Sequence, residues 1–574
     1  MQLDVLLYST AGDKAFGPCL AALRAAGEGV TFGRVALVGT AGQGAAAAGF
    51  ADVHHYAAKP GREARGLARA AAAAGAPWLL VMDAGFQVLA DFFEAIEAGL
   101  TRWPAAGGFE CRQLPWETQQ LVDPVGLELP CLCGGAVLLR RAALPVGGLD
   151  GRLPLKAALQ DLSFRMRAED QRLYWLAGAV VTAPDAAEMG LEHYTQAALG
   201  RLLLSYKYRL PGGAAAARKQ YRETLKRPRH FAGVRKALLR QYLLHWPRGL
   251  GLLFSRSATR AASLLAEKAL AEPPRGLQPL AAPVPSGPRI SVVIRTHKRT
   301  HQLRCALQSV ANQTYTNIEV VVVEDGEADS QSMIEAEFPQ LDVRYHATGQ
   351  NVGRSRAGNI GLQMAGGEYL NLLDDDDLFY PDHLERVAAE AVAHPEADLI
   401  TCNAMAMYVE AADKAPCGAN VERYEAIHID RLDLFMMAQR CQVHVSGVVF
   451  KKELYRQCGG FDEAMPAHED WALWLRYFAV GRRIHPQQVD IARATTVYVL
   501  PASEAERNAK LAQYHRYDTA FFGDERLRFT VGLADMRRFY DGLIADMLHL
   551  RALGPEALDA YLEAQLHRND APED

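Results

Sequence analysis

The sequence predicts an α/β protein made of two large units that share one strand pattern. The chain has 574 residues, which is too many for one hydrophobic core, because single cores stop growing near about 250 to 300 residues. In both halves short apolar runs alternate with helical patterns, which is typical of largely parallel sheets. A proline-rich stretch, AEPPRGLQPLAAPVPSGPR, separates the two halves. Such a composition indicates a linker.

Five segments are expected along the chain. They are a first α/β unit (1–192), a basic helical connector (193–270), the proline-rich linker (271–288), a second α/β unit (289–500) and a helical C-terminal extension (501–574).

Four landmarks recur in the same order in the two units. LDVLLYST, which starts at Leu3, corresponds to ISVVIRTH, which starts at Ile290, and WLLVMDAG corresponds to YLNLLDDD. Further along, GGAVLLRRAALPVGGLD corresponds to SGVVFKKELYRQCGGFD, and QDLSFRMR to EDWALWLR. This order favours duplication of one fold. Two unrelated α/β units with similar strand patterns are the alternative.

The bulk composition is that of an ordinary globular protein. With 49% hydrophobic and 22% charged residues and a net charge of -5, the chain as a whole is not expected to bind nucleic acid. The N-terminus has no basic region or cleavage site, and no window offers about 18 apolar residues in a row. The nine cysteines are scattered, as expected for reduced thiols. These features predict a cytoplasmic protein.

The connector and the C-terminal extension allow more than one interpretation. Residues 201–260 carry fifteen Lys and Arg and a single acid, Glu223, between apolar runs. Amphipathic helices with a basic face would suit peripheral contact with an anionic membrane leaflet. A connector packed on acidic domain surfaces is the equal alternative. The helices after Pro501 are candidates for packing, for contacts between copies of the chain, or for acceptor contacts.

Several polar residues of the second unit are expected at the carboxyl ends of its first strands, where ligands bind in open parallel sheets. They are Thr296, His297, Arg299, Glu324 and Asp325. A nucleotide would lie in this crevice, where Asp325 could accept the imide N–H of uracil. A turn-forming aspartate in the dipeptide Asp-Gly is the alternative for that residue.

The apolar strand YLNLL is followed directly by four aspartates, Asp374 to Asp377. Carboxylates at the end of a buried strand repel one another and lose hydration, which costs several kcal/mol unless a cation lies among them. A hard divalent ion with oxygen ligands would remove this cost. A solvated acidic loop is the alternative.

Together, Asp325, the segment NVGRSRAGNIG and the D-x-D-D run before Pro381 resemble the donor half of an inverting family 2 glycosyltransferase with the GT-A fold. The resemblance implies two tandem GT-A domains that use a nucleotide-sugar donor with Mn²⁺ or Mg²⁺. It implies that Asp376 binds the metal and that Asp374 contacts the metal or the ribose. Asp375 belongs to the same donor-binding segment, and Arg354 is expected to contact the pyrophosphate.

The resemblance also implies that Glu469 and Asp470 begin a helix at the reaction centre, where the acceptor binds. An acceptor hydroxyl needs a positioned base, and Asp470 is the candidate, with helix capping as the alternative. Trp471 and Trp474 are expected to stack on a sugar, or else to pack in the core. The family often has a histidine after the last core strand; here ATTVYVLPAS keeps Tyr498 without one. A third metal ligand therefore stays unassigned.

The first unit retains only part of this pattern. Asp83 and Asp161 correspond to Asp374 and Asp470, but Gly85 stands where the metal residue Asp376 would be. Because glycine has no side-chain ligand, we expect a degenerate, noncatalytic GT-A domain. A second active site with a different mechanism is the alternative.

The leading hypothesis is transfer of one sugar, from a UDP-linked donor, to a hydroxyl of a glycan, a lipid-linked oligosaccharide or a protein. A bifunctional polysaccharide polymerase with two working sites is the nearest alternative. A noncatalytic carbohydrate-binding scaffold is the alternative from a different class, and the complete set of aspartates in the second unit argues against it.

Overall fold

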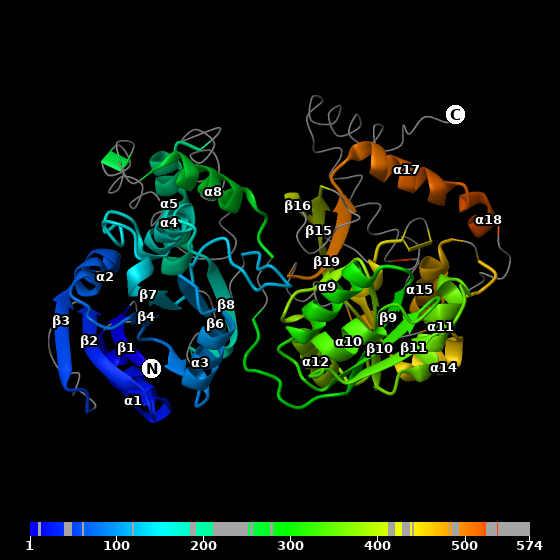
Figure 1. The fold of residues 1–574 in the computed structure, drawn as a ribbon, viewed down its shortest axis with the longest axis horizontal. Coiled ribbons are helices and arrows are strands. Elements are labelled where there is room, and N and C mark those ends of the chain that lie inside the picture. Colours follow the sequence, from blue (N-terminus) through cyan, green and yellow to red (C-terminus); the bar gives the residue numbers. More distant parts are fainter. Residues whose placement is uncertain are drawn as a thin grey trace.

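The computed structural model describes residues 1–523 and residue 537, apart from a number of segments. Those segments are 10–12, 40–48, 60–61, 118–119, 184–190, 211–250, 253–254, 256–257, 276–278, 411–419, 428–436, 439–440, 466, 481–482 and 485–492. The described residues form two α/β lobes that lie side by side (Figure 1). The mixed α/β fold predicted from the sequence is confirmed.

The first lobe is built on an eight-stranded sheet. Its strands, in spatial order, are β3 (Asp52–Ala57), β2 (Thr31–Gly39), β1 (Gln2–Tyr8), β4 (Trp78–Asp83), β7 (Ala136–Arg140), β6 (Gly108–Leu114), β8 (Leu173–Thr182) and β5 (Gln87–Val88). The helices are α1 (Phe16–Ala26), α2 (Glu63–Ala72), α3 (Phe92–Arg102), α4 (Leu155–Ala168), α5 (Leu191–Tyr208) and α8 (Arg260–Ala271). All of β4 is buried, as expected for a strand covered on both faces.

The second lobe contains a seven-stranded and a four-stranded sheet. The larger sheet has the order β11 (Val343–Ala347), β10 (Ile318–Glu324), β9 (Ile290–Thr296), β12 (Tyr369–Asp374), β17 (Val448–Lys451), β14 (Leu399–Thr401) and β18 (Arg483–Ile484). The smaller sheet has the order β13 (Leu378–Phe379), β19 (Ala494–Pro501), β15 (Asn403–Val409) and β16 (Val421–Ile427). The helices are α9 (Thr300–Ala311), α10 (Gln331–Glu337), α11 (Arg354–Met364), α12 (His383–Ala393), α14 (Lys452–Cys458), α15 (Glu469–Val480), α17 (Glu504–His515) and α18 (Asp518–Phe522).

The two large sheets share one strand order over six strands. The order β3-β2-β1-β4-β7-β6 in the first lobe matches β11-β10-β9-β12-β17-β14 in the second. They differ beyond this point, because β8 pairs with β6 over most of its length, whereas β18 and β19 pair separately with β14 and β15. Three of the four recurring landmarks therefore fall on strands at equivalent places in the two sheets, β1 and β9, β4 and β12, β7 and β17, and the fourth falls on helices α4 and α15.

A buried ion network joins the two lobes. Glu117 of the first lobe accepts hydrogen bonds from Arg112 at 2.6 Å, from Arg386 at 2.9 Å and from Arg493 at 3.0 Å. Arg112 also pairs with Glu385, at 2.7 Å. All five side chains are at least 95% buried. Since an unpaired buried charge is costly, this network favours one relative arrangement of the lobes.

The connector and the C-terminal extension are described only in part. Helices α5 and α8 flank residues 211–250, so the predicted basic membrane-facing surface lies largely outside the described residues. Among the helices that the structure does describe, none is long and apolar enough to cross a membrane. Cys305 is disulfide-bonded, so the prediction that all nine cysteines are reduced is wrong at this position. Seven other cysteines within the described ranges are free thiols.

Candidate active site

The carboxyl ends of β9, β10 and β12 meet at one edge of the second-lobe sheet. The three strands are parallel, and their register sets Glu324 opposite Thr296 and Asp374 opposite Arg295. Thr296 Oγ1 donates to Asp375 Oδ2 at 2.7 Å. Residues that are far apart in the sequence therefore surround one group of carboxylates.

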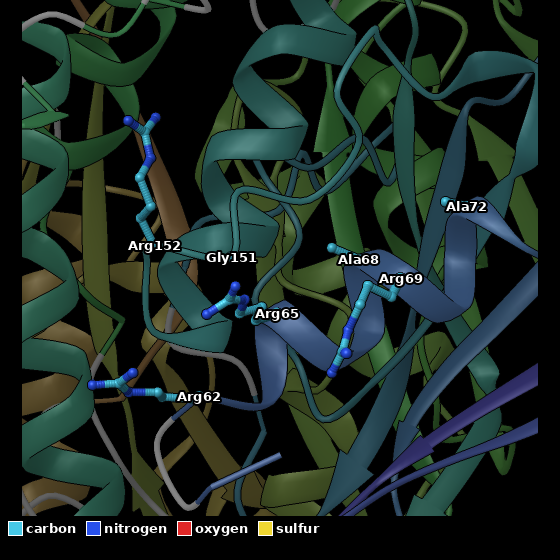
Figure 2. A pocket seen from close by; sticks show the side chains of 7 residues that line it. All are labelled: Arg62, Arg65, Ala68, Arg69, Ala72, Gly151 and Arg152. Atoms are coloured by element: carbon cyan, nitrogen blue, oxygen red, sulfur yellow. The ribbon is translucent and has the colours of Figure 1, made fainter. Parts of the chain in front are cut away.

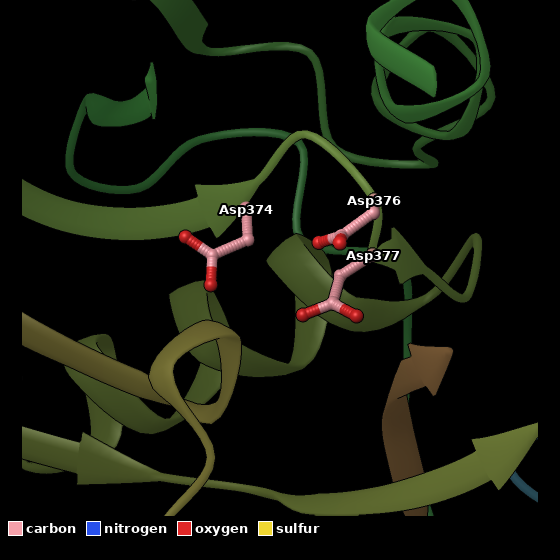
Figure 3. A group of neighbouring side chains, drawn as sticks. All are labelled: Asp374, Asp376 and Asp377. Atoms are coloured by element: carbon pink, nitrogen blue, oxygen red, sulfur yellow. The ribbon is translucent and has the colours of Figure 1, made fainter. Parts of the chain in front are cut away.

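Three of the four consecutive aspartates converge at this edge. Carboxylate oxygens of Asp374, Asp376 and Asp377 all lie within 4.8 Å of one another, and Figure 3 shows the three side chains turned toward a common space. Asp375 points elsewhere, toward Thr296 and Arg299. Arg299 Nη1 lies 3.0 Å from Asp375 and 3.1 Å from Asp376. The side chains of Asp374 and Asp376 are about one third exposed, so both can reach a ligand.

The electrostatics of this cluster fit a divalent cation. Burial, and then the neighbouring Asp376 carboxylate, raises the pKa of Asp375 to about 6. Burial and Asp374 raise the pKa of Asp376, and burial and Asp376 raise the pKa of Asp377 well above its usual range. Carboxyl groups resist ionising together when no cation separates them. A hard cation with oxygen ligands would relieve this repulsion.

His444 lies beside the carboxylates although no sequence pattern pointed to it. Its Nε2 is 3.2 Å from Asp377 Oδ2, and its ring packs on Tyr498 with 4.3 Å between centroids. Nδ1 is buried and has no hydrogen-bond partner among the described residues. Burial lowers the pKa of His444 to about 4, so the imidazole is neutral at pH 7. The histidine that packs on Tyr498 is therefore His444, from the segment before β17. The family pattern instead places a histidine after the last core strand, which is β19 here.

Asp325 and His297 shape the loop in front of α11. Asp325 accepts N–H groups from Val352 at 2.6 Å and Gly353 at 3.0 Å. The His297 Nδ1 atom contacts the Asp325 carbonyl oxygen. Each carboxylate oxygen has two lone pairs, so Asp325 keeps acceptor capacity for a base. Its role in uracil binding stays a prediction.

The donor-binding role predicted for Glu324 is corrected by its surroundings. The side chain is buried, and it accepts hydrogen bonds from Ser330 N at 2.9 Å, Ser330 Oγ at 3.0 Å and Tyr345 Oη at 2.6 Å. These contacts hold the side chain at the start of α10 and beside β11. Glu324 therefore stabilises the fold around the site instead of lining it.

Arg295 links the donor edge to the start of α15. Its guanidinium lies 3.5 Å from Asp374 and 3.2 Å from Glu469. Glu469 also pairs with Arg354, at 2.9 Å, and is only 3% exposed. The acceptor contact predicted for Glu469 is therefore corrected, because its carboxylate is enclosed by two guanidiniums. Asp470 follows at the same helix start and remains partly exposed.

For Trp471 and Trp474 the core-packing alternative is confirmed, and the predicted sugar-stacking role is corrected. Trp474 has no exposed surface and packs on Phe450, with 5.8 Å between centroids. Trp471 is 7% exposed and stacks on Phe521 of α18 at 4.5 Å. Both rings are thus covered by other aromatic side chains. The C-terminal extension, whose role the sequence left open, packs through α18 on the start of α15.

In the first lobe, the aspartates at the corresponding positions are already bound to other residues of the chain. Asp161, the counterpart of Asp470, is fully buried and pairs with Lys207 at 2.6 Å and Arg165 at 2.9 Å. Asp83 accepts the N–H of Gly85, at 3.0 Å. Glu63 begins α2, twenty residues before Asp83, just as Arg354 begins α11 twenty residues before Asp374. Glu63 therefore places a carboxylate at the position where the second lobe has the guanidinium of Arg354, which is expected to contact the pyrophosphate.

Part of the second lobe is similar to a known protein family. Residues 291–443 match the model of the family described as "Glycosyl transferase family 2". The putative glycosyltransferase EpsH of Bacillus subtilis (strain 168) is 34% identical over 119 residues, which are 20% of this chain and 33% of that protein. This chain thus spans about a third of that relative.

Two solved structures show a weaker likeness. S. aureus TarS 1-349, in complex with UDP-GlcNAc, is 17% identical with a TM-score of 0.32, covering 43% of this chain and 68% of that one. The mannosyltransferase PcManGT from Pyrobaculum calidifontis, in complex with GDP-Man and Mn²⁺, is 19% identical with a TM-score of 0.32, covering 51% of this chain and 84% of that one.

Proposed function

We propose, on the premise that residues 291–443 form a glycosyltransferase family 2 domain, that this protein transfers a sugar from a nucleotide-diphosphate donor to an acceptor hydroxyl with inversion. The acceptor classes are a glycan, a lipid-linked oligosaccharide or a protein. The observation that carries the proposal is the convergence of Asp374, Asp376 and Asp377 at the carboxyl edge of a parallel sheet. This convergence lies inside the family match.

In this proposal Asp376 and Asp374 hold Mn²⁺ or Mg²⁺, and the buried carboxylate of Asp377 lies next to them. When bound, the cation supplies Lewis-acid stabilisation of the departing diphosphate. Arg354, at the start of α11, is 44% exposed and can approach the same phosphates, where a helix N-terminus also favours negative charge. A UDP donor is proposed because Asp325 can accept the imide N–H of uracil.

Asp470 acts as the general base. It takes the proton of the acceptor hydroxyl while the oxygen forms a bond to the anomeric carbon, and the bond from that carbon to the diphosphate oxygen breaks on the opposite face. Arg295 ties the helix start that carries Asp470 to Asp374. The base and the donor site are therefore held in one relative position.

The first lobe is proposed to be a degenerate GT-A domain without catalytic activity. Gly85 offers no metal ligand, and Asp161 is neutralised by Lys207 and Arg165. These contacts favour a single active site over the two-site polymerase. A cytoplasmic location remains a prediction, which the disulfide at Cys305 does not favour.

The first test is a donor screen with the full chain and Mn²⁺ or Mg²⁺, reading the release of nucleoside diphosphate. We expect release from one nucleotide sugar, a UDP-sugar on this proposal, to stop with EDTA and to recover when excess metal is added back. Turnover that EDTA leaves unchanged would contradict the metal assignment. Absence of release from every donor would favour the noncatalytic scaffold.

His444→Ala is expected to raise the Mn²⁺ concentration for half-maximal rate by about 10- to 100-fold, the usual cost of removing a group that orients metal ligands. The rate at saturating metal should fall much less. His346→Ala on β11 is the control, because that histidine is exposed. Equal metal dependence in both variants would mean that His444 only packs against Tyr498.

A further inference from the structure

A hollow of about 520 Å³ on the first lobe is lined by four arginines. Three of them, Arg62, Arg65 and Arg69, come from α2 and the residue before it, and Arg152 comes from the loop before α4. Figure 2 shows the four side chains along one side of α2 and across from it. The volume lies within the range of about 300 to 1,000 Å³ that is usual for ligand sites.

The chain geometry brings these guanidiniums together. Arg62, Arg65 and Arg69 are three and four residues apart, so they follow one stripe of a helix. Across from them, the loop carrying Arg152 approaches α2 closely, because a Cβ atom on Gly151 would lie 2.9 Å from Arg65 Cα. Only glycine permits this approach, which sets Arg152 opposite the stripe.

The hollow has little negative charge of its own. Arg152 pairs with Asp150, at 2.7 Å, but this carboxylate is shared with Lys207, at 2.9 Å. Within the described part of the chain, Arg62 and Arg65 have neither an ion pair nor a side-chain hydrogen bond. Arg69 donates only to a backbone carbonyl. Guanidiniums bind phosphate and carboxylate groups well, because their planar N–H groups match two oxygens at once.

We propose that this hollow binds the acceptor, and that the acceptor is a glycan chain bearing phosphate or carboxylate groups. This inference rests on the proposed glycosyl transfer, since it assigns the substrate class of the same enzyme. The helical rise places Arg62 and Arg69 about 10 Å apart along α2. A chain with repeated anionic groups can contact the whole length of such a row.

The lining favours a glycan over other polyanions. Between the arginines the surface is formed by Ala68, Ala72 and Gly151, so among the described residues no aromatic ring lines the hollow on which nucleic-acid bases could stack. The part of the lining that the structure describes also has no large apolar side chain of the kind that inserts into a membrane beside basic residues. Helix α2, which carries Arg65 and Arg69 of the hollow, lies on the side of the first lobe away from the second lobe (Figure 1). An acceptor held at both places must therefore be long.

The test measures binding of the full chain to a fluorescent oligogalacturonate of about ten sugars, with an uncharged maltodextrin of equal length as the comparison ligand. The double variant Arg62→Ala/Arg65→Ala should weaken oligogalacturonate binding at least 10-fold, because it removes two charge-assisted contacts. The matched control is Arg172→Ala/Arg456→Ala, two arginines that are 70% and 62% exposed and lie outside the hollow. This control should keep wild-type affinity.

Three results would overturn the proposal: no binding of oligogalacturonate, equal binding by both double variants, or stronger arginine-dependent binding of single-stranded RNA or of anionic lipid vesicles. Asp376→Ala should bind oligogalacturonate as the wild type does, so a failure of the proposed catalysis would leave this readout intact. With a working donor, Arg62→Ala/Arg65→Ala should raise KM for long anionic acceptors, whereas the control Arg172→Ala/Arg456→Ala should keep the wild-type KM.

Discussion

Asp376→Ala is expected to lower kcat for sugar transfer by about 10⁴-fold. The proposed metal would stabilise charge on the departing diphosphate by several kcal/mol, and each factor of ten in rate corresponds to about 1.4 kcal/mol. Asp377 is poorly placed to replace the proposed ligand Asp376, since it is buried and hydrogen-bonded to Val499 N and Ser446 Oγ. The measurement is the initial rate of nucleoside diphosphate release across a Mn²⁺ titration.

Asp83→Ala is the matched control in the first lobe. It removes the aspartate at the end of the equivalent strand, β4, beside Gly85. We expect its kcat to equal that of the wild type, with thermal unfolding recorded for both variants to separate folding from catalysis. If Asp83→Ala abolished transfer while both proteins stayed folded, the first lobe would carry an active site. The two-site polymerase would then be favoured.

The sequence predicted the strands well because their signals are local. IEVVVVE and YLNLL are continuous apolar runs that only a doubly covered strand accommodates, and both are almost wholly buried. Since the carboxyl ends of parallel strands meet at one edge, Thr296 and the four aspartates could be assigned to one site. The convergence of Asp374, Asp376 and Asp377 follows from the same local segment.

Other parts of the site depend on contacts that no local pattern reveals. His444 lies 67 residues beyond Asp377 in the sequence, and only the packing of its ring on Tyr498 brings it to the carboxylates. Glu324 was misassigned because a strand-end carboxylate can point to either side, and here Ser330 and Tyr345 hold it away from the donor edge. Trp474 was misassigned because its spacing from Trp471 fits a core helix face as well as an exposed wall.

Asp470→Asn is expected to lower kcat by about 10³-fold, within the range that general-base catalysis supplies. Asp470 Oδ1 accepts the N–H of Trp471, at 2.8 Å, and the Asn side-chain oxygen can keep this hydrogen bond. The variant should therefore fold normally. A wild-type rate in Asp470→Asn would reduce the role of this residue to capping α15.

The pH dependence of the transfer rate distinguishes a general base at Asp470 from a residue with only a structural role. Burial, and then the adjacent Glu469 carboxylate, raises the pKa of Asp470. The base must be ionised to accept a proton, so the wild-type rate should fall as pH drops through a pKa above the usual value of about 3.9. In Asp470→Asn the rate should be low, and this decrease of the rate at acidic pH, the acid limb of the profile, should be absent. Glu469→Gln, which loosens Arg295 and Arg354, should raise KM for the donor and keep the limb, because Asp470 remains to take the proton.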